Sequence, residues 1–442
     1  MSAMTVADLR SEVEPWPMTA SEQALWNQYL RDPDDTSYLL PIVVDVRGQD
    51  ATATVRRVMP QVLDRYPVLR SSPTWDAPPR WAPGTLRPGA LVDATDLGDD
   101  EPAWIAAVQD LASRPFEDLS SEPPCRYGIV AVTEDRCLLW FVVHHIATDL
   151  HGAGILLQEF RALLAGDTLP APVPSTALSV VEAEYLTSAE RADDLAFWRQ
   201  EAAALPTIPP PDAAGAGIAV RTRHLEPAEA DALVAAARNA RRPFGSVVQA
   251  AFCLALHRLD SRDAVSVGVT CNLRHDPAVA FACGYAVNTV PVRSQLGAAS
   301  VAGYLDDFVP RSRAVHRHQR LPAAEIAAAR GADARSPLFD DLLVFTLDRS
   351  EDTRQRWLLD PDGPDAAAGR FRLRRVAASR GALQCRSILT VCRDAAGLGI
   401  WLEYRPDSIA DPERVLDDVV TRMRLLLSDP DAPMPTTRGE ES

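Results

Sequence analysis

Two adjacent histidines and an aspartate form the strongest chemical signal in the sequence. His144, His145 and Asp149 (HHIATD) directly follow the apolar run CLLWFVV, which predicts a buried strand. Successive side chains of a strand face opposite sides, so one imidazole should enter the core and the other should line a cleft. The ordinary imidazole pKa of about 6.5 suits proton transfer near neutrality. The pattern therefore predicts one exposed imidazole, with the second histidine and a carboxylate supporting the turn. A structural interpretation stays open beside this one, because a histidine among apolar residues is often a satisfied core residue.

The elements around this motif alternate between helical and strand periodicity, which predicts a mixed α/β fold. In the first half, helices are expected over residues 21–30, 53–66 and 152–164, and strands over 38–46, 127–132 and 137–143. Pro60 is expected to kink or restart the second of these helices. In the second half, helices are expected over 227–240, 246–259 and 412–427, and strands over 218–225, 264–270, 286–292, 342–345, 388–392 and 398–404.

The segment 206–217 (PTIPPPDAAGAG) has the composition of a linker. It predicts an N-terminal lobe over residues 1–205, which carries the histidine motif, and a C-terminal lobe over residues 218–442. A chain of 442 residues is long enough for two such core-forming units.

Composition excludes several classes of protein. The net charge is -16, so a nucleic-acid partner is not expected, because such a partner requires a basic surface. The sequence contains no lysine, which excludes a lysine nucleophile or Schiff base. No apolar run reaches the roughly 20 residues of a membrane span, and the acidic start does not resemble a signal peptide. No membrane partner is expected.

The seven cysteines, in apolar runs and without a CxxC pair, indicate buried reduced thiols in a cytoplasmic protein. The eight histidines form no zinc pattern, so no metal is expected.

Several segments, in order along most of the chain, resemble the condensation domains of nonribosomal peptide synthetases, within the chloramphenicol acetyltransferase-like HHxxxD acyltransferases. They are the HHxxxD motif itself, SEQALW (21–26), RYPVLR (65–70), Tyr185 with Phe197-Trp198, GYAVNTVPVR (284–293) and RSPLF (335–339, matched to a family strand). The resemblance implies two chloramphenicol acetyltransferase-like lobes forming a V, with the site in a central channel open on both faces.

The resemblance also implies residue roles. His145 is then the catalytic imidazole and His144 a structural residue. Asp149 forms a salt bridge with an arginine of the second lobe, for which Arg274 is the matching position. Asn288 and Thr289 lie near the lobe junction, where they line the channel or hydrogen-bond a loop.

The sequence departs from the family pattern directly after the motif. The family has glycine where this chain has Leu150, a residue that could narrow the donor channel or mark a subfamily. An aromatic residue and a serine are replaced by His151 and Gly152. His151 is either a third catalytic group or a helix-start residue that faces the carrier entrance.

The function implied by the resemblance is acyl transfer. The expectation is a free-standing condensation enzyme that joins a carrier-bound acyl or aminoacyl thioester to a small-molecule amine, or in second place a hydroxyl, in specialised-metabolite biosynthesis. No cofactor would be bound, because the acyl group arrives on the phosphopantetheine of a carrier protein acting in trans. The alternatives are an acyl-CoA-dependent O- or N-acyltransferase of the same superfamily and a non-catalytic relative that recruits enzymes to a carrier.

Overall fold

The computed structural model describes residues 14–97, 100–208, 217–331, 336–347, 354–360, 363–379 and 381–434. Contacts divide the chain into two compact units, and neither is continuous in sequence. Unit 1 contains residues 1–188, 272–287 and 354–382. Unit 2 contains 189–271, 288–353 and 383–442. Residues 189–205, assigned to the first lobe from the sequence, thus group with unit 2, and two later segments group with unit 1. The lobe ranges remain a prediction about folding, which contact grouping does not test.

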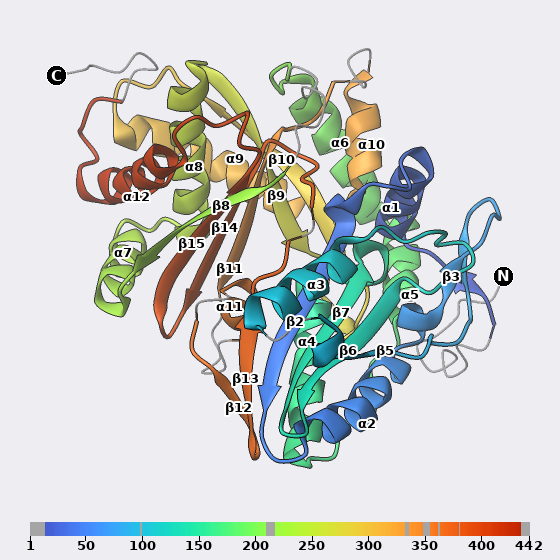
Figure 1. Ribbon diagram of the computed structural model, residues 1–442. Coiled ribbons are helices and arrows are strands. Elements are labelled where there is room, and N and C mark those ends of the chain that lie inside the picture. The colour runs from blue at the N-terminus through green and yellow to red at the C-terminus, as the bar shows by residue number, and fades with distance from the viewer. Residues whose placement is uncertain are drawn as a thin grey trace. The chain divides into compact units, whose positions relative to one another are not determined.

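Unit 1 is built on a six-stranded sheet with the order β12-β13-β2-β7-β6-β5 (Figure 1). Its strands are β2 (Leu39–Arg47), β5 (Ala90–Asp93), β6 (Cys125–Thr133), β7 (Arg136–His144), β12 (Ala366–Ala368) and β13 (Phe371–Val376). The central strand β7 is buried from Cys137 to His144, which explains its nearly continuous apolar sequence. A smaller sheet of β1 (Trp16–Pro17), β4 (Arg80–Ala82) and β3 (Ser72–Pro73) accompanies it.

The helices of unit 1 are α1 (Ala20–Arg31), α2 (Ala51–Asp64), α3 (Glu101–Ser113), α4 (Leu150–Ala165), α5 (Thr176–Leu186) and α11 (Arg354–Leu359). Of these helices, α2, α3 and α4 contact the six-stranded sheet. α2 packs against α4, and α3 contacts β2 and β7. The helix does not restart at Pro60, because α2 is continuous through that residue; the kink stays a prediction. Pro60 removes one backbone donor, which the packing of the buried face of α2 evidently tolerates.

Unit 2 holds a second six-stranded sheet with the order β10-β9-β11-β14-β15-β8. Its strands are β8 (Ala219–Leu225), β9 (Ala264–Asn272), β10 (Val287–Gln295), β11 (Asp341–Leu347), β14 (Ser387–Asp394) and β15 (Gly397–Tyr404). Residues 336–339, matched to a family strand in the sequence, contain no strand and precede β11. Arg335 of that match lies outside the described residues.

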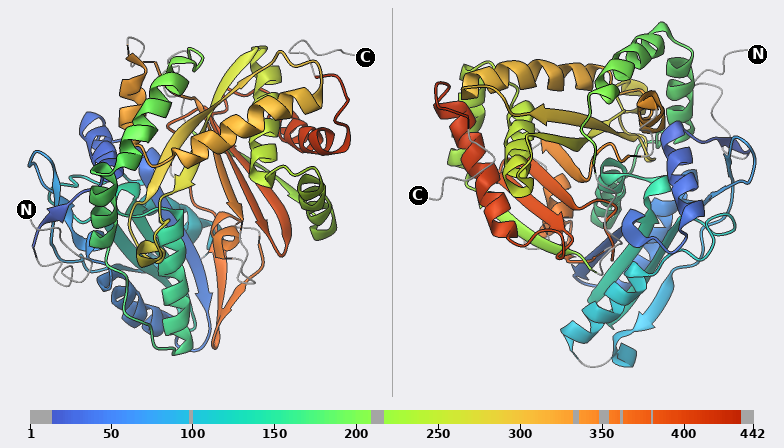
Figure 2. Two further views of the ribbon diagram at one scale, coloured as in Figure 1. Left: turned by 180° about the vertical axis from the view of Figure 1, so that it is seen from behind. Right: turned by 90° about the horizontal axis from the view of Figure 1, so that it is seen from above.

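The helices of unit 2 are α6 (Ala189–Ala203), α7 (Pro227–Asn239), α8 (Phe244–Asp260), α9 (Val301–Arg317), α10 (Ala323–Ala329) and α12 (Pro412–Ser428). α8 is buried along nearly its whole length and packs against α12, as the yellow-green and red helices of Figure 2 show. Apolar side chains from α8, α9, α12 and the sheet form one continuous core. The mixed α/β class predicted from the sequence is confirmed.

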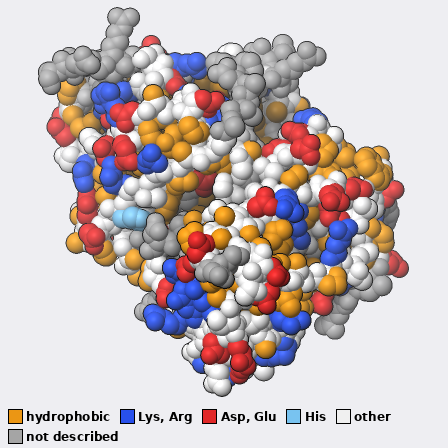
Figure 3. All heavy atoms as spheres, viewed as in Figure 1, with side chains coloured by type: hydrophobic (Ala, Val, Ile, Leu, Met, Phe, Trp, Pro, Cys, Tyr) orange, Lys and Arg blue, Asp and Glu red, His pale blue; other side chains and the backbone are white. Residues whose placement is uncertain are grey.

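Charged side chains are distributed rather than grouped by sign. On the face drawn in Figure 3, acidic and basic side chains lie beside one another. Many arginines pair with carboxylates, such as Arg65 with Glu159 and Arg258 with Asp418. No helix among the residues that the structure describes is long and apolar enough to cross a membrane.

Candidate functional site

The histidine motif lies where β7 ends and a short 3-10 turn leads into α4. β7 ends at His144, residues His145–Ala147 form the turn, and Asp149 is the N-cap of α4. His144 is therefore the last paired residue of β7, opposite Leu39, and His145 is the first residue beyond the strand.

His144 is enclosed by the core of unit 1. It is 3% exposed and lies among the rings of Tyr29, Tyr38 and Phe116, with centroids about 6 Å away. Its Nδ1 accepts a hydrogen bond from the backbone N–H of Ile146 at 3.1 Å. Burial, and then the nearby His145, lower the pKa of His144 to about 3, so this imidazole is neutral at physiological pH. A neutral ring that accepts a backbone hydrogen bond supports the turn.

His145 is only partly buried, and its ring is oriented by the same turn. Its Nδ1 lies 3.1 Å from the backbone oxygen of Thr148. A carbonyl oxygen can only accept, so the neutral ring carries its proton on Nδ1 and its lone pair on Nε2. The ring of Tyr285 meets His145 edge-on, with centroids 5.9 Å apart. Burial raises the pKa of Tyr285 above its ordinary value, so its hydroxyl stays protonated.

Asp149 is a fully buried carboxylate at the start of α4. Its Oδ1 accepts from the backbone N–H of Gly152 at 2.9 Å, and its Oδ2 accepts from Arg274 Nη1 at 2.7 Å and from the backbone N–H of Ala286 at 2.9 Å. Burial alone would raise the pKa of Asp149, but the charge of Arg274 and these hydrogen bonds lower it below its ordinary value. The carboxylate is therefore ionised and fixed, which makes it unsuited to proton transfer.

Arg274 joins the motif to the segment 272–287. Beyond Asp149, its guanidinium donates to the backbone oxygens of Ala282 at 3.0 Å and Gly284 at 2.7 Å. The sequence expectation placed this arginine in the second lobe. By contact, however, segment 272–287 belongs to unit 1, and the ion pair lies within one unit. Because Tyr285 belongs to the same segment, the ion pair also fixes the ring beside His145.

Leu150 and His151 both have identifiable contacts. Leu150 begins α4 with a negative φ and packs against the core of unit 1, so this position does not require glycine. His151 Nε2 lies 2.9 Å from the backbone oxygen of Ala280, which makes His151 a donor to the loop of segment 272–287. That contact supports the reading of His151 as a structural helix-start residue.

Gly152 explains how the turn closes without the glycine of the family pattern. A Cβ atom on Gly152 would overlap the hydroxyl oxygen of Thr148, at a separation that no real contact allows. Thr148 is fully buried, and its hydroxyl also lies 3.7 Å from Cys283 Sγ. In this chain glycine is therefore needed at position 152, two residues after Leu150. It lies against Thr148, whose carbonyl orients His145.

Asn288 and Thr289 belong to unit 2. The amide of Asn288 donates to the backbone oxygens of Gln319 and Leu321, at 2.8 and 2.7 Å, and its oxygen accepts from the N–H of Ala323. Asn288 therefore holds the loop that begins α10, which is the loop-bonding alternative of the sequence analysis. Thr289 is partly buried on β10.

Sequence reasoning assigned no role to Thr148, Cys283 or Tyr285. The partner of His145 is a backbone oxygen, for which the sequence holds no signal. Cys283 and Tyr285 lie 138 and 140 positions after His145. The only hint was that Tyr285 falls within the GYAVNT segment.

Comparison with known proteins gives a consistent result. Residues 16–374 match the model of the Condensation domain family. The chain is 26% identical over 368 residues to one of the plipastatin synthase subunits of Bacillus subtilis (strain 168), covering 80% of this chain but only 14% of that much longer protein.

Two solved structures share the fold. One is a variant of the starter condensation domain of rhizomide synthetase RzmA in complex with C8-CoA, with a TM-score of 0.75, 21% identity, and coverage of 95% of this chain and 96% of the other. The second is the X-domain from teicoplanin biosynthesis, with a TM-score of 0.75, 20% identity, and coverage of 96% and 97%.

Proposed function

Because the chain belongs to the condensation domain family, we propose that it transfers an acyl or aminoacyl group from a carrier-bound thioester to the amine of a small-molecule acceptor. Condensation domains form amide bonds, so membership of this family indicates acyl transfer. The carrier, the thioester and the amine are the proposal. A hydroxyl acceptor, which would give an ester, is the second choice.

One observation carries the proposal: the orientation of His145. Its Nδ1–H donates to the backbone oxygen of Thr148, which leaves the lone pair on Nε2. The turn, the buried His144 and the ion pair of Asp149 with Arg274 hold this tautomer and ring position. A ring fixed in this way can accept a proton without first reorganising.

The proposed reaction needs no covalent enzyme intermediate, since a thioester already contains its leaving group. The amine nitrogen attacks the thioester carbon, the C–N bond forms, and the C–S bond then breaks. Nε2 of His145 accepts the proton that the nitrogen loses and passes it to the departing pantetheine sulfur. Such a base is worth about 10²–10⁴-fold, and alignment of the two substrates contributes further. His145 could instead orient the amine or stabilise the tetrahedral oxyanion.

The carrier partner is proposed from the relatives. The matched relative in Bacillus subtilis belongs to a plipastatin synthase, and a probable nonribosomal peptide synthetase of Salinispora arenicola (strain CNS-205) is 28% identical over 361 residues. The expectation of a free-standing enzyme stays part of this proposal. It requires that the chain accept an acyl-carrier protein added as a separate polypeptide. No bound cofactor is invoked, because the phosphopantetheine is part of the substrate.

A second candidate is acyl transfer directly from coenzyme A. The observation that favours it is the solved relative in complex with C8-CoA. The non-catalytic alternative has less support, because His145, Asp149 and Arg274 are all present and in contact with the groups described above.

The test compares His145→Ala with the wild type, using the acylated carrier or acyl-CoA as donor and a panel of amines, with intact-mass detection of the carrier and product. We expect His145→Ala to lose about 10²–10⁴-fold in amide formation while keeping its melting temperature and its carrier affinity. His224→Ala, which removes an exposed histidine of β8, is the matched control and should keep full activity. Turnover of His145→Ala within threefold of the wild type would contradict the catalytic role. Transfer from acyl-CoA but never from the carrier would favour the second candidate.

A further inference from the structure

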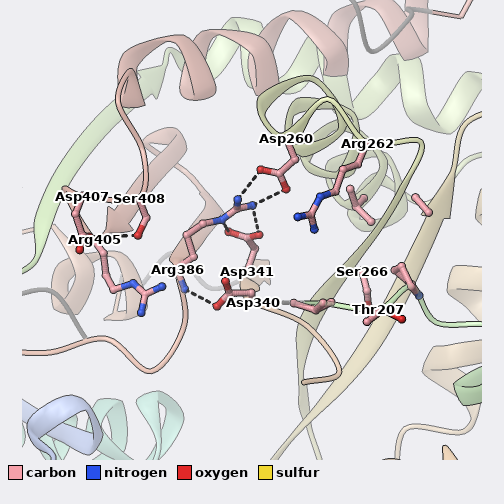
Figure 4. A pocket seen from close by; sticks show the side chains of 14 residues that line it. Thr207, Asp260, Arg262, Ser266, Asp340, Asp341, Arg386, Arg405, Asp407 and Ser408 are labelled. Carbon is pink, nitrogen blue, oxygen red and sulfur yellow. Dashed lines mark hydrogen bonds and ion pairs between the residues drawn. The ribbon is translucent and has the colours of Figure 1, made fainter. Parts of the chain in front are cut away.

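A polar cavity of about 310 Å³ lies in unit 2, and no residue of the histidine motif lines it. It is formed where α8 ends, where β11 and β14 begin, and where the chain leaves β15 (Figure 4). This volume is at the lower end of the range of small-molecule sites. Its lining contains four aspartates and three arginines, so only an arginine that is not paired with an aspartate could bind an anion.

Two of the aspartates share one arginine within the wall. Arg386 donates from Nη1 to Asp260 at 2.5 Å and from Nε to Asp341 at 3.0 Å, and Nη2 contacts both carboxylates. Ser387 adds a hydroxyl hydrogen bond to Asp341 at 2.6 Å. These groups form a closed network, and Arg386 is fully used by it.

Arg405 differs from Arg386, because the Nε of its guanidinium is buried and makes no hydrogen bond. The residue is 6% exposed, and its buried Nε has no hydrogen-bond partner among the described residues. No salt bridge or side-chain hydrogen bond of Arg405 occurs in that part of the chain either, although its charge acts on Asp340. Buried guanidinium donors are normally satisfied, since a missing hydrogen bond is costly. An arginine left in this state on a cavity wall indicates a ligand that supplies the acceptor.

Three further charged groups line the cavity, one arginine and two aspartates. Arg262 presents a second guanidinium at the same cavity (Figure 4). Asp340 accepts the backbone N–H of Arg386 at 3.1 Å, and burial, followed by the neighbouring Asp341, raises the pKa of Asp340. Asp407 accepts from the hydroxyl of Ser408 at 3.2 Å, at an exposed position.

We propose that this cavity binds the oxyanion group of a small molecule, a carboxylate or a phosphate, through Arg405 with Arg262 as a second cation. A guanidinium fork matches both groups, because each offers two oxygens in one plane. The site would be separate from acyl transfer, and the proposal does not depend on the reaction assigned above.

The experiment measures binding of inorganic phosphate and of acetate to the intact chain, by calorimetry and thermal shift, at constant ionic strength set with chloride. We expect at least one of the two anions to bind and to raise the melting temperature. Arg405→Met should weaken that binding by at least about tenfold, since a charge-assisted pair is lost. Arg424→Gln, which removes an exposed arginine of α12, should bind the anion as the wild type does.

The melting temperature in the absence of phosphate and acetate distinguishes a ligand-binding role of Arg405 from a structural one. A binding arginine that makes no hydrogen bond should cost little when replaced, so Arg405→Met should unfold near the wild-type temperature in chloride alone. Arg262→Gln, at an exposed position, supplies a second variant that will fold, and it should weaken binding several-fold. The proposal is overturned if the wild type binds neither anion, if both variants bind as the wild type does, or if Arg405→Met is strongly destabilised in chloride.

Discussion

At the scale of single residues, the site depends on an ion pair removed from water. The side chains of Asp149 and Arg274 are 2% and 1% exposed, and the pair joins the start of α4 to the segment that contains Tyr285. Removal of one partner leaves the other charge buried and uncompensated.

Arg274→Gln should therefore lower the free energy of unfolding by about 3–5 kcal/mol at pH 7, as measured by urea denaturation. Arg424→Gln, which breaks the exposed pair with Glu229, should change it by less than about 1 kcal/mol. Equal losses of stability in the two variants would show that the buried ion pair does not stabilise the fold more than an exposed pair does.

Two glycines of α4 offer a matched comparison. A Cβ on Gly152 would clash with Thr148, whereas a Cβ on Gly154 would meet nothing closer than 3.8 Å. We expect Gly152→Ala to lower the melting temperature and acyl-transfer activity together, because Thr148 must move and its carbonyl orients His145. Gly154→Ala should be neutral or stabilise the chain by up to about 1 kcal/mol, as alanine favours a helix. Equal melting curves for the two variants would show that the turn can relax around the methyl group.

Some residues of the site could be predicted from the sequence, and others could not. The pattern of the sequence located His144, His145 and Asp149, since strand alternation and the following turn are local features. Arg274 lies 125 residues from Asp149 in sequence, so it came only from the family resemblance. The role of Thr148 was missed because it acts through a backbone oxygen, which every residue possesses.

At the scale of elements, α1 shows how a local signal and burial act together. Thr19 and Glu22 form a reciprocal capping box, with Thr19 N–H donating to the Glu22 carboxyl at 2.7 Å. Burial, opposed by the Thr19 hydrogen bonds, raises the pKa of Glu22 to about 8. The folded chain thus holds a proton here that the unfolded chain releases near pH 4.5. The stability contributed by this proton is complete below pH 4.5 and is lost as the pH rises to about 8.

Glu22→Gln removes this titration while keeping an acceptor for Thr19. Between about pH 5.5 and 8.5, the wild type should lose on the order of a few kcal/mol more in free energy of unfolding than Glu22→Gln does. Urea denaturation at the two pH values measures the difference. Glu413→Gln, which changes an exposed carboxylate on α12, should follow the wild type. Parallel pH profiles of wild type and Glu22→Gln would show that Glu22 does not hold the proton.

Most elements followed from local patterns, with ends within about three residues. The apolar runs of β2, β7, β14 and β15 are typical of buried strands, and α8 and α12 followed from helical periodicity. The helices α3, α9, α10 and α11 and the strands β1, β3, β4, β5, β12 and β13 were not predicted. β13 alternates apolar and arginine residues and pairs with β2, about 330 positions earlier, and nothing in the local sequence identifies that partner.

At the scale of the whole molecule, each unit depends on distant parts of the chain. β13 covers the edge of β2, and segment 272–287 supplies Arg274, so residues 1–188 alone lack both. An open edge strand and an unpaired buried carboxylate favour aggregation over folding. The predicted V of two lobes with a central channel remains a prediction.

A fragment of residues 1–188 should therefore fail to fold cooperatively. We expect it to lack a sharp thermal transition by circular dichroism and to aggregate, while the intact chain unfolds cooperatively. A fragment of residues 1–205, the lobe expected from the sequence, should behave in the same way. A cooperative transition of either fragment at the melting temperature of the intact chain would show that the later segments are dispensable.

All seven cysteines of the chain are buried, and burial raises the pKa of those where a shift is resolved, such as Cys125 and Cys253. The folded protein thus presents no reactive thiolate that could intercept an acyl group by transthioesterification. An activated thioester should survive beside it until an acceptor arrives. Maleimide reagents should also label the pantetheine thiol of a mixed sample before they label this chain.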